Sequence, residues 1–348
     1  MSNANVSDPA VRFRDVDIVF GKNPEHALSM IDAGKSRAEI NEETGQVLAV
    51  AGCTLDIHHG EIVVLMGLSG SGKSTLLRAI NGLTKVTRGA AHVHNGTDLI
   101  DPSRCGQDAL RDLRTRCVAM VFQQFALLPW RSVAENVGYG LELSGMPRKQ
   151  RLAVVERQLE LVGLEGWADR RVHELSGGMQ QRVGLARAFA TEAPILLMDE
   201  PYSALDPLIR TSLQDELLEL QKKSRRTIVF VSHDLDEAIK LGTRIAIMES
   251  GRIVQVGTPQ DIIMKPADDY VADFVAHMNP LNVLRAREVM RTVTPRGIDG
   301  DADTVTADTP MRTLIRRCLK QNGQVDVVDQ GKVVGVVDAQ SVLSALIR

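Results

Sequence analysis

The residues best suited to chemistry form a glycine-rich segment, Gly67-Leu-Ser-Gly-Ser-Gly-Lys-Ser74. An apolar run, Glu61–Met66, precedes this segment, and Ser74–Ile80 follows it with helical spacing, which is the strand–loop–helix order of a phosphate-binding loop. Glycines let backbone N–H groups turn toward a phosphate, and the helix N-terminus adds partial positive charge. The residues predicted to bind the nucleotide here are Gly67, Ser69, Gly70, Ser71, Gly72, Lys73, Ser74 and Thr75, with Lys73 on the β- and γ-phosphates and the Ser74 hydroxyl on Mg²⁺.

A second glycine-rich turn, Leu175-Ser-Gly-Gly-Met-Gln-Gln181, opens a helix much further along the chain. Such a turn is well suited to hold a phosphate from the opposite side. One chain cannot easily fold both segments onto one nucleotide, whereas two copies facing head to tail can. The pair of segments therefore predicts a homodimer driven by ATP.

Two acidic residues follow another apolar run, Pro194–Met198, which we expect to be a buried strand. Asp199, at the strand end, is placed to hold the metal, and Glu200 is placed to polarise the attacking water. An isolated Asp-Glu pair more often marks a strand end that faces solvent. The presence of the phosphate loop in the same chain favours the catalytic interpretation.

A histidine, His233, closes the next apolar run, Arg226–Ser232. Ligands bind at the carboxyl edge of parallel sheets, so His233 is placed to contact the γ-phosphate. A lone histidine is more often a structural or surface residue. Its position directly after this strand favours the ligand-binding interpretation.

These segments together resemble the ATP-binding subunits of ABC transporters, and the resemblance covers Val11 to about Asn282. The family's other motifs follow in the same order: the Q-loop glutamine, Gln123, in Val121–Pro129, and the D-loop, Ser203–Asp206. The resemblance implies an α/β fold, a P-loop ABC ATPase cassette with a RecA-like core sheet and an α-helical subdomain. It also implies ATP and Mg²⁺ as cofactors.

The resemblance further implies catalytic roles. Glu200 is expected to be the base and His233 the γ-phosphate sensor. Gln123 is expected to approach Mg²⁺ and the water, and to report the nucleotide state to the membrane partner. The expected metal ligands are Ser74, Gln123 and Asp199. Phe20 is the candidate for the aromatic residue that stacks on adenine, with a plain strand core residue as the alternative.

The resemblance also implies residues that act between the two protomers. Ser176 and Gly178 are expected to act on the γ-phosphate that the other protomer holds. Asp206 is expected to link the two sites across the dimer. Gly177 and Gln180 complete the expected nucleotide-binding set.

The composition fits a soluble ATPase subunit. The chain has 348 residues, a net charge of −3 and a pI of about 6.3, so no basic excess indicates nucleic-acid binding. No apolar run approaches the roughly 18 residues of a membrane helix, and the polar start predicts no signal peptide. The cysteines are scattered without a CxxC pattern, which predicts reduced thiols rather than a metal site. The resemblance implies a peripheral protein at the cytoplasmic face of the inner membrane, bound to an integral membrane permease and working with a periplasmic or extracellular substrate-binding protein.

The domain organisation follows from the pattern along the chain. We expect an ABC nucleotide-binding domain over residues 1–282, with a helical subdomain over about 104–190 that carries the signature turn. Leu152, Val155, Leu159 and Val162 recur at helical spacing within that subdomain. We expect a small module over residues 283–348.

An insertion, Pro24–Gln46, indicates which kind of ABC transporter subunit the chain resembles. It reads as a short helix ended by Gly34 and a second helix that starts with the capping-box spacing Ser36-x-x-Glu39. Its plain interpretation is a surface helical hairpin. Together with Met66-Gly-Leu-Ser, it resembles the ATP-binding subunits of quaternary-amine importers, which carry glycine betaine, proline betaine, choline or carnitine.

The last segment predicts a helix, two strands and a helix. Met311, Leu314, Ile315, Cys318 and Leu319 form an apolar helical face, and a Gln330-Gly331 turn separates Val325–Val328 from Val333–Val337. The final helix is expected over about Ala339–Ile347. The pattern resembles a single or truncated CBS-type (cystathionine-β-synthase) regulatory module. Because Asp338 and Ser341 stand where that family has a Thr and an Asp for ribose or phosphate, we favour a dimerising or salt-responsive role over nucleotide sensing.

Other classes fit less well. A translation or DNA-repair ABC protein needs two cassettes or a long coiled-coil insertion, and neither occurs in the sequence. A P-loop kinase would not need the signature turn. Among importers, the alternative is an ATPase subunit for polyamines, amino acids or sulfonates, which usually lacks the Pro24–Gln46 hairpin.

Overall fold

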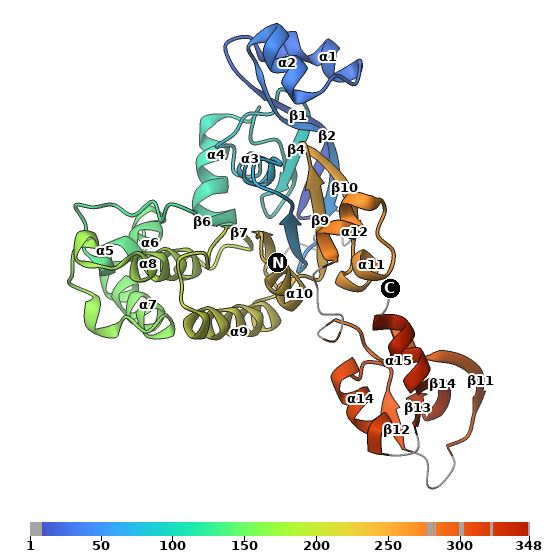
Figure 1. Cartoon of the computed structure of the whole chain (residues 1–348). Helices are drawn as coiled ribbons and strands as arrows, with labels where there is room; N and C mark the ends of the chain where they lie inside the picture. Colours follow the sequence, from blue (N-terminus) through green and yellow to red (C-terminus); the bar gives the residue numbers. More distant parts are fainter. Residues whose placement is uncertain (1–8, 277–280, 282, 299–302, 321–322, 347–348) are drawn as a thin grey trace. The chain divides into compact units, whose positions relative to one another are not determined.

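A computed structural model describes residues 9–276, 281, 283–298, 303–320 and 323–346 of the chain (Figure 1). Contacts divide the chain into two compact units, residues 1–256 and residues 257–348. The boundary expected near Asn282 and the expected helix end at Ile347 both lie outside the described residues. The division falls before α11 (Pro259–Met264) and α12 (Asp269–Val275), so these two helices belong to the second unit.

A six-stranded sheet in the order β10-β9-β3-β8-β7-β6 forms the centre of the first unit. Parallel pairing joins β9 to β3, β3 to β8, β8 to β7 and β7 to β6. Every residue of β3, β6, β7 and β8 is buried, as expected for a parallel sheet covered on both faces. The carboxyl ends of these strands therefore meet at one edge. The strands are β3 (Ile62–Met66), β6 (Val118–Val121), β7 (Ile195–Asp199), β8 (Thr227–Val231), β9 (Arg244–Glu249) and β10 (Arg252–Gly257).

A four-stranded antiparallel sheet packs against this core in the order β2-β1-β4-β5. Its strands are β1 (Val11–Phe20), β2 (Val47–Ile57), β4 (Arg88–His94) and β5 (Leu99–Ile100). Phe13 and Ile57 of this sheet share one buried cluster with Leu65 and Leu197 of the parallel sheet. Burial of these side chains supplies much of the free energy that joins the two sheets.

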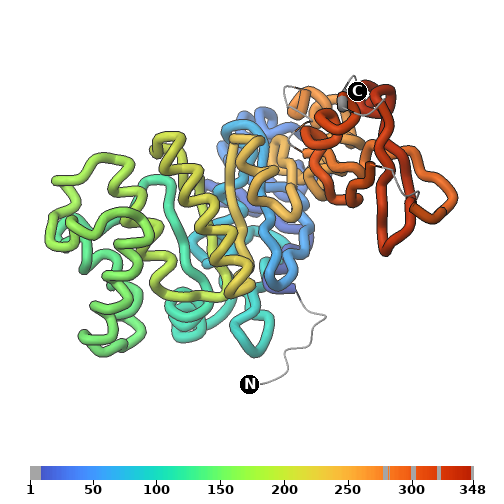
Figure 2. Tube along the Cα trace, turned by 90° about the horizontal axis from the view of Figure 1, so that it is seen from below, coloured from blue at the N-terminus to red at the C-terminus, as the bar shows by residue number. Residues whose placement is uncertain are grey.

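The helices of the first unit fall into a core group and a separate arm. Figures 1 and 2 both show α5–α8 gathered at the side of the sheets away from β1, β2 and β4. The core helices are α3 (Lys73–Ala79), α4 (Gln107–Asp112), α9 (Pro207–Ser224) and α10 (Leu235–Leu241). The arm helices are α5 (Val133–Val137), α6 (Tyr139–Leu143), α7 (Arg148–Leu161) and α8 (Gly177–Ala190). Shorter helical turns are η2 (Leu113–Cys117), η3 (Glu165–Trp167) and η4 (Val172–Glu174).

Two expectations for the arm need correction. The stretch 104–190 is not wholly helical, because β6 lies within it and forms the edge of the parallel sheet. Leu152 is 52% exposed, whereas Val155 and Leu159 on the same helix are buried. Periodicity identified the apolar face of α7, but the neighbouring helices cover only its C-terminal half.

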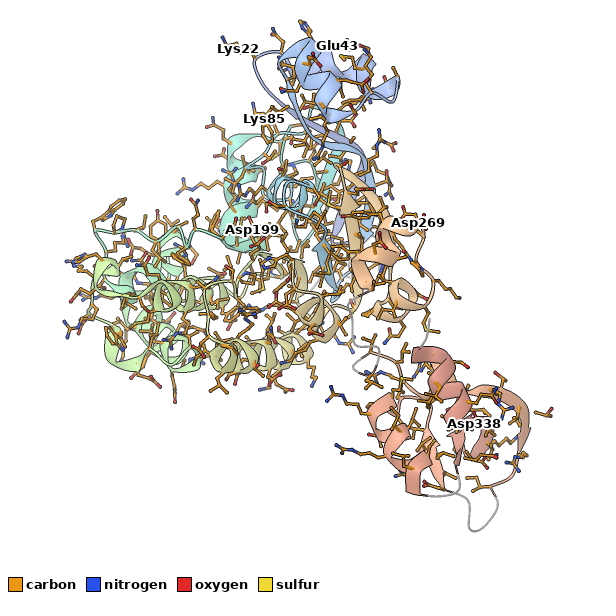
Figure 3. The ribbon with its side chains drawn as sticks, viewed as in Figure 1. Lys22, Glu43, Lys85, Asp199, Asp269 and Asp338 are labelled. Atoms are coloured by element: carbon orange, nitrogen blue, oxygen red, sulfur yellow. The ribbon has the colours of Figure 1, made fainter. Side chains whose placement is uncertain are left out.

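The insertion forms η1 (Pro24–Ala27), α1 (Leu28–Asp32) and α2 (Arg37–Thr44). The predicted capping box is confirmed, since Ser36 and Glu39 bond each other's backbone N–H groups. Gly45 ends α2 with a left-handed φ of 66°. In Figure 3, Lys22 and Glu43 mark this part of the chain.

The described residues of the second unit form a four-stranded sheet in the order β11-β14-β13-β12 and five helices. Its strands are β11 (Arg291–Arg296), β12 (Thr304–Thr306), β13 (Gln324–Asp329) and β14 (Lys332–Asp338). Its further helices are α13 (Ala286–Val289), α14 (Met311–Lys320) and α15 (Ala339–Leu346). The two strands around Gln330-Gly331 are confirmed, and the sequence did not predict β11 or β12. Leu319 does not belong to the apolar face of α14, because its side chain is 81% exposed.

Within the described ranges, no helix is both long and apolar enough to cross a membrane. All four cysteines fall in those ranges, and each is a free thiol.

Candidate functional site

The loop after β3 can take its shape only with glycine at two positions. Gly67 has a φ of 139°, and a Cβ there would lie 2.1 Å from the Met248 carbonyl oxygen. Gly72 has a φ of 103°, and a Cβ there would lie 2.5 Å from the Ala49 carbonyl oxygen. Both neighbours are backbone atoms that cannot move aside. The two glycines therefore fix the loop against β9 and β2.

Lys73 and Ser74 begin α3 with their side chains in the site. Lys73 Nζ donates to the carbonyl oxygens of Gly67 at 2.8 Å and Leu68 at 2.9 Å. Burial lowers the pKa of Lys73, while Glu200 and Asp199 oppose this shift. Ser74 Oγ donates to Asp199 Oδ1 at 2.6 Å.

Asp199 is fully buried at the end of β7, and Figure 3 shows it in the interior of the first unit. Its second oxygen accepts a bond of 2.9 Å from Arg78 Nη2. Sequence reasoning missed Arg78, because the contact joins α3 to a strand far along the chain. The Ser74 hydroxyl and the Asp199 carboxylate are hard oxygen donors side by side, which suits Mg²⁺.

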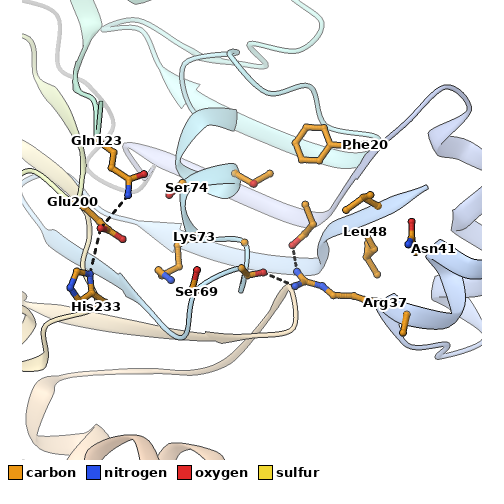
Figure 4. A pocket seen from close by; sticks show the side chains of 16 residues that line it. Phe20, Arg37, Asn41, Leu48, Ser69, Lys73, Ser74, Gln123, Glu200 and His233 are labelled. Carbon is orange, nitrogen blue, oxygen red and sulfur yellow. Dashed lines mark hydrogen bonds and ion pairs between the residues drawn. The ribbon is translucent and has the colours of Figure 1, made fainter. Parts of the chain in front are cut away.

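The three predicted catalytic side chains lie together at the carboxyl edge of the sheet (Figure 4). Gln123 Nε2 donates to Glu200 Oε2 at 3.3 Å, and His233 Nδ1 lies 3.5 Å from the same oxygen. Glu200 has a left-handed φ of 47°, an unfavourable conformation for this residue type. Such strain is often retained where the position of a side chain matters for function.

One cavity of about 800 Å³ collects most of the predicted residues. Phe20 lies at its edge and is 47% exposed, so it is not a core residue. Arg37 and Asn41 of the hairpin also line the cavity, and sequence reasoning missed both. The lining residues are Phe20, Arg37, Ala38, Asn41, Val47, Leu48, Ala49, Ser69, Gly70, Gly72, Lys73, Ser74, Thr75, Gln123, Glu200 and His233.

The signature turn and the D-loop do not line this cavity. Ser176 caps α8, since its Oγ accepts from Met179 N at 3.3 Å, and Gln180 Nε2 bonds the Val172 and Leu175 carbonyls. Asp206 caps α9 by accepting from Ile209 N at 3.1 Å. Gly177 and Gly178 form the first turn of α8. These residues therefore lie outside the cavity of their own chain.

Gln181 connects the signature helix to the catalytic turn. Its side chain is buried, donates to the Glu200 carbonyl at 3.1 Å and accepts from Ala204 N at 2.9 Å. A change in the position of α8 would thus be felt directly at the backbone of Glu200. Nothing in the sequence distinguishes Gln181 from the adjacent Gln180, so the burial of its amide could not be predicted.

Fold and site together define the ATP-binding subunit of an ABC transporter. The ABC transporter family model matches residues 50–203. The dimeric structure of MJ0796, a bacterial ABC transporter cassette, superposes with a TM-score of 0.62 at 30% identity, covering 72% of this chain and 98% of that one.

Two curated proteins show which ABC transporter subunits this chain is similar to. The chain is 49% identical to the Escherichia coli (strain K12) glycine betaine/proline betaine transport system ATP-binding protein ProV, over 80% of this chain and 69% of that protein. It is 41% identical to the trimethylamine N-oxide transport system ATP-binding protein TmoW of Ruegeria pomeroyi, over 99% of this chain and 98% of that protein. The chain belongs to the family of ATP-binding subunits of ABC transporters that includes these two proteins.

Proposed function

We propose that this chain hydrolyses ATP to energise an ABC importer of quaternary amines, namely choline, glycine betaine or proline betaine. The observation that carries the proposal is the 49% identity to the glycine betaine/proline betaine subunit over most of the chain. The Pro24–Gln46 hairpin supports the same group. The alternative, an importer of polyamines, amino acids or sulfonates, is supported by the spermidine/putrescine import ATP-binding protein PotA of Mesorhizobium japonicum, which is 44% identical over 74% of this chain. The match to the glycine betaine/proline betaine protein is higher in identity and covers more of this chain, which favours the quaternary-amine group.

A second candidate solute is trimethylamine N-oxide. The relative named for that solute matches this chain over 98% of its own length, so the two proteins correspond from end to end. Trimethylamine N-oxide shares a trimethylated, fully substituted nitrogen with choline and glycine betaine. The two candidates therefore differ in the solute's polar group rather than in the kind of nitrogen.

The proposed reaction assigns a step to each clustered side chain. Glu200 takes a proton from the attacking water, and His233 contacts the γ-phosphate. Gln123, within hydrogen-bond reach of Glu200, positions the water and links the site to the membrane partner. Lys73 holds the β- and γ-phosphates. Phe20 would stack on adenine, and its exposure at the cavity edge supports this role.

Mg²⁺ would be held by Ser74 and Asp199, with Gln123 approaching it. The ion would neutralise negative charge on the phosphate chain. Arg78 binds the Asp199 oxygen that does not face Ser74 and would fix the orientation of the carboxylate. Asp199 would keep this orientation whichever way Ser74 turns.

The proposed assembly is a homodimer of this subunit with an integral membrane permease and a periplasmic or extracellular substrate-binding protein. Ser176, Gly178 and Asp206 lie away from the cavity of their own chain, which supports action on the nucleotide of the partner protomer. The subunit would sit at the cytoplasmic face of the inner membrane. It would have no nucleic-acid partner.

Uptake measurements test the proposed solute. A strain that lacks the gene is expected to lose ATP-dependent uptake of labelled choline, glycine betaine or proline betaine, and to regain it with the wild-type gene. Labelled trimethylamine N-oxide tests the second candidate in the same strain. Undiminished uptake of all four solutes, with loss of a polyamine or amino acid, would contradict both proposals.

For residues 283–348, within the second unit, we propose a single or truncated CBS-like module with a dimerising or salt-responsive role. Its helix–strand–strand–helix segment supports this assignment. Asp338 and Ser341 bond each other within the unit, which supports a role other than nucleotide binding. Ser341 N donates to Asp338 Oδ1 at 2.8 Å, and Arg291 pairs with the same carboxylate. These hydrogen bonds lower the pKa of Asp338. Because Ser341 and Arg291 already occupy the Asp338 carboxylate, it is not free to bind a ribose. This supports the expectation that the unit binds no adenine nucleotide tightly.

Removal of residues 257–348 is expected to leave most of the ATPase activity, because every predicted catalytic residue lies before Val256. What should change is the dependence of transport on ionic strength or substrate load. Transport assays in membrane vesicles at several salt concentrations measure this change. An unaltered salt response would contradict the salt-responsive role. Micromolar binding of an adenine nucleotide that Arg291→Ala weakens would contradict the expectation that the unit binds no adenine nucleotide tightly.

A further inference from the structure

The helix α2 of the insertion forms one wall of the nucleotide cavity. Arg37, Ala38 and Asn41 line the cavity, although they belong to none of the motifs that predicted the site. Arg37 and Asn41 are four positions apart and therefore lie on one face of the helix. Figure 4 shows both residues on the side of the cavity that carries Leu48 and Phe20.

The position of α2 is fixed by packing and by its caps. Ile40 is fully buried in a small cluster with Val19, Ile31 and Leu48. The Arg88 guanidinium holds the preceding helix through both oxygens of Asp32, at 2.7 and 2.9 Å. Ile40 lies three positions after Arg37 and one before Asn41, so its burial against the sheet holds this side of α2 next to the cavity that Arg37 and Asn41 line.

Arg37 spans the gap between the hairpin and the phosphate loop. Its Nη1 donates to the Gly70 carbonyl at 2.6 Å, and its Nη2 donates to the Ala49 carbonyl. Gly251 leaves room for the guanidinium, because a Cβ there would lie 2.6 Å from Arg37 Nη2. The loop, β2 and the β9–β10 turn thus surround this side chain.

The charge of Arg37 has no carboxylate partner in the described part of the chain. Its two bonds go to neutral carbonyls, and its Nε is buried without a hydrogen-bond partner. Burial also lowers the pKa of Arg37. A partly desolvated cation is costly unless an anion approaches it. The phosphate loop beside it is the place where an anion binds.

We propose that Arg37 is a nucleotide-binding residue that contacts the phosphate chain, and that Asn41 on the same helix face contacts the ribose or base. This rests on the proposed ATPase function. A guanidinium is the side chain best suited to phosphate oxygens, because its donors form a planar fork. Arg37 adds a second cation to Lys73, from the opposite wall of the site. The insertion is thus part of the nucleotide-binding site rather than only a surface helical hairpin.

Titration of the full-length chain with ATP and with inorganic tripolyphosphate tests the proposal. Arg37→Ala is expected to weaken both ligands roughly 10- to 100-fold, as for loss of a charged hydrogen bond. Lys35→Ala is the matched control, since it removes the same charge from the same hairpin. Lys35 pairs with Glu43 and does not line the cavity, so its variant should bind both ligands like the wild type.

A second variant separates ligand contact from support of the loop. Arg37→Gln removes the charge but keeps one amide nitrogen that can donate to the Gly70 or the Ala49 carbonyl. Its melting temperature should therefore lie closer to that of the wild type than that of Arg37→Ala does, yet it should bind tripolyphosphate as weakly as Arg37→Ala does. Full recovery of tripolyphosphate affinity by Arg37→Gln, or unchanged affinity in Arg37→Ala, would overturn the proposal. Absence of ATP binding by the wild-type chain would instead overturn the proposed ATPase function itself.

Discussion

A Glu200→Gln variant is expected to bind ATP like the wild type and to hydrolyse it roughly 10²–10⁴-fold more slowly. The amide has the size of the carboxylate but cannot accept the proton of the attacking water. Gln123 and His233 both lie within 3.5 Å of the Glu200 carboxylate, so the shape of the cluster should persist. Because hydrolysis no longer empties the site, an ATP-bound dimer should accumulate. Steady-state phosphate release and size-exclusion chromatography with ATP measure the two effects.

Glu192→Gln provides a matched control. Glu192 also has a left-handed φ, of 52°, and is exposed in the turn before β7, away from the cavity. The same chemical change at that position should leave turnover unaltered. Near-normal hydrolysis by Glu200→Gln in the presence of the permease would contradict the assignment of Glu200 as the catalytic base.

The sequence predicted those parts of the site that depend on local pattern. The order of strand, glycine-rich loop and helix predicted β3 and α3, and the apolar runs predicted β7 and β8. Parallel strands present their carboxyl ends at one edge, so Asp199, Glu200 and His233 were expected to meet there. Gln123 required the family resemblance, since nothing in its neighbours identifies it as a residue of the site.

The sequence did not predict contacts between distant segments. Arg78 and Asp199 are 121 positions apart, and only the pairing of α3 with the sheet brings them to 2.9 Å. Arg37 was not predicted for a related reason. The hairpin reads as a polar surface element, and its docking depends on only three buried apolar side chains, those of Ala27, Ile31 and Ile40. Periodicity likewise marked Leu319 and Leu152 as apolar positions, but it carries no information on which part of a face a neighbour will cover.

The division of the site between two segments leads to a further prediction about the dimer. The cavity holds Lys73 but none of the signature residues, and Ser176 caps a helix outside it. If Ser176 acts on the partner's nucleotide, Lys73→Ala and Ser176→Arg should each abolish hydrolysis when alone. In a heterodimer of the two variants, both defects fall in one composite site and the other site is intact.

Mixing the two variants should therefore restore activity that neither variant has alone. Random pairing makes about half of the dimers mixed, and each has one intact site of two, so about a quarter of wild-type turnover is expected when the sites act independently. Strict coupling between the sites would suppress this turnover, so nucleotide occupancy is measured as well, with Glu200→Gln added to both chains. One trapped ATP per mixed dimer is then expected, since only the site with an intact Lys73 and an intact partner Ser176 can close. Mixed dimers that form, as shown by differently tagged chains, but trap no ATP and recover no turnover would contradict action of Ser176 across the interface.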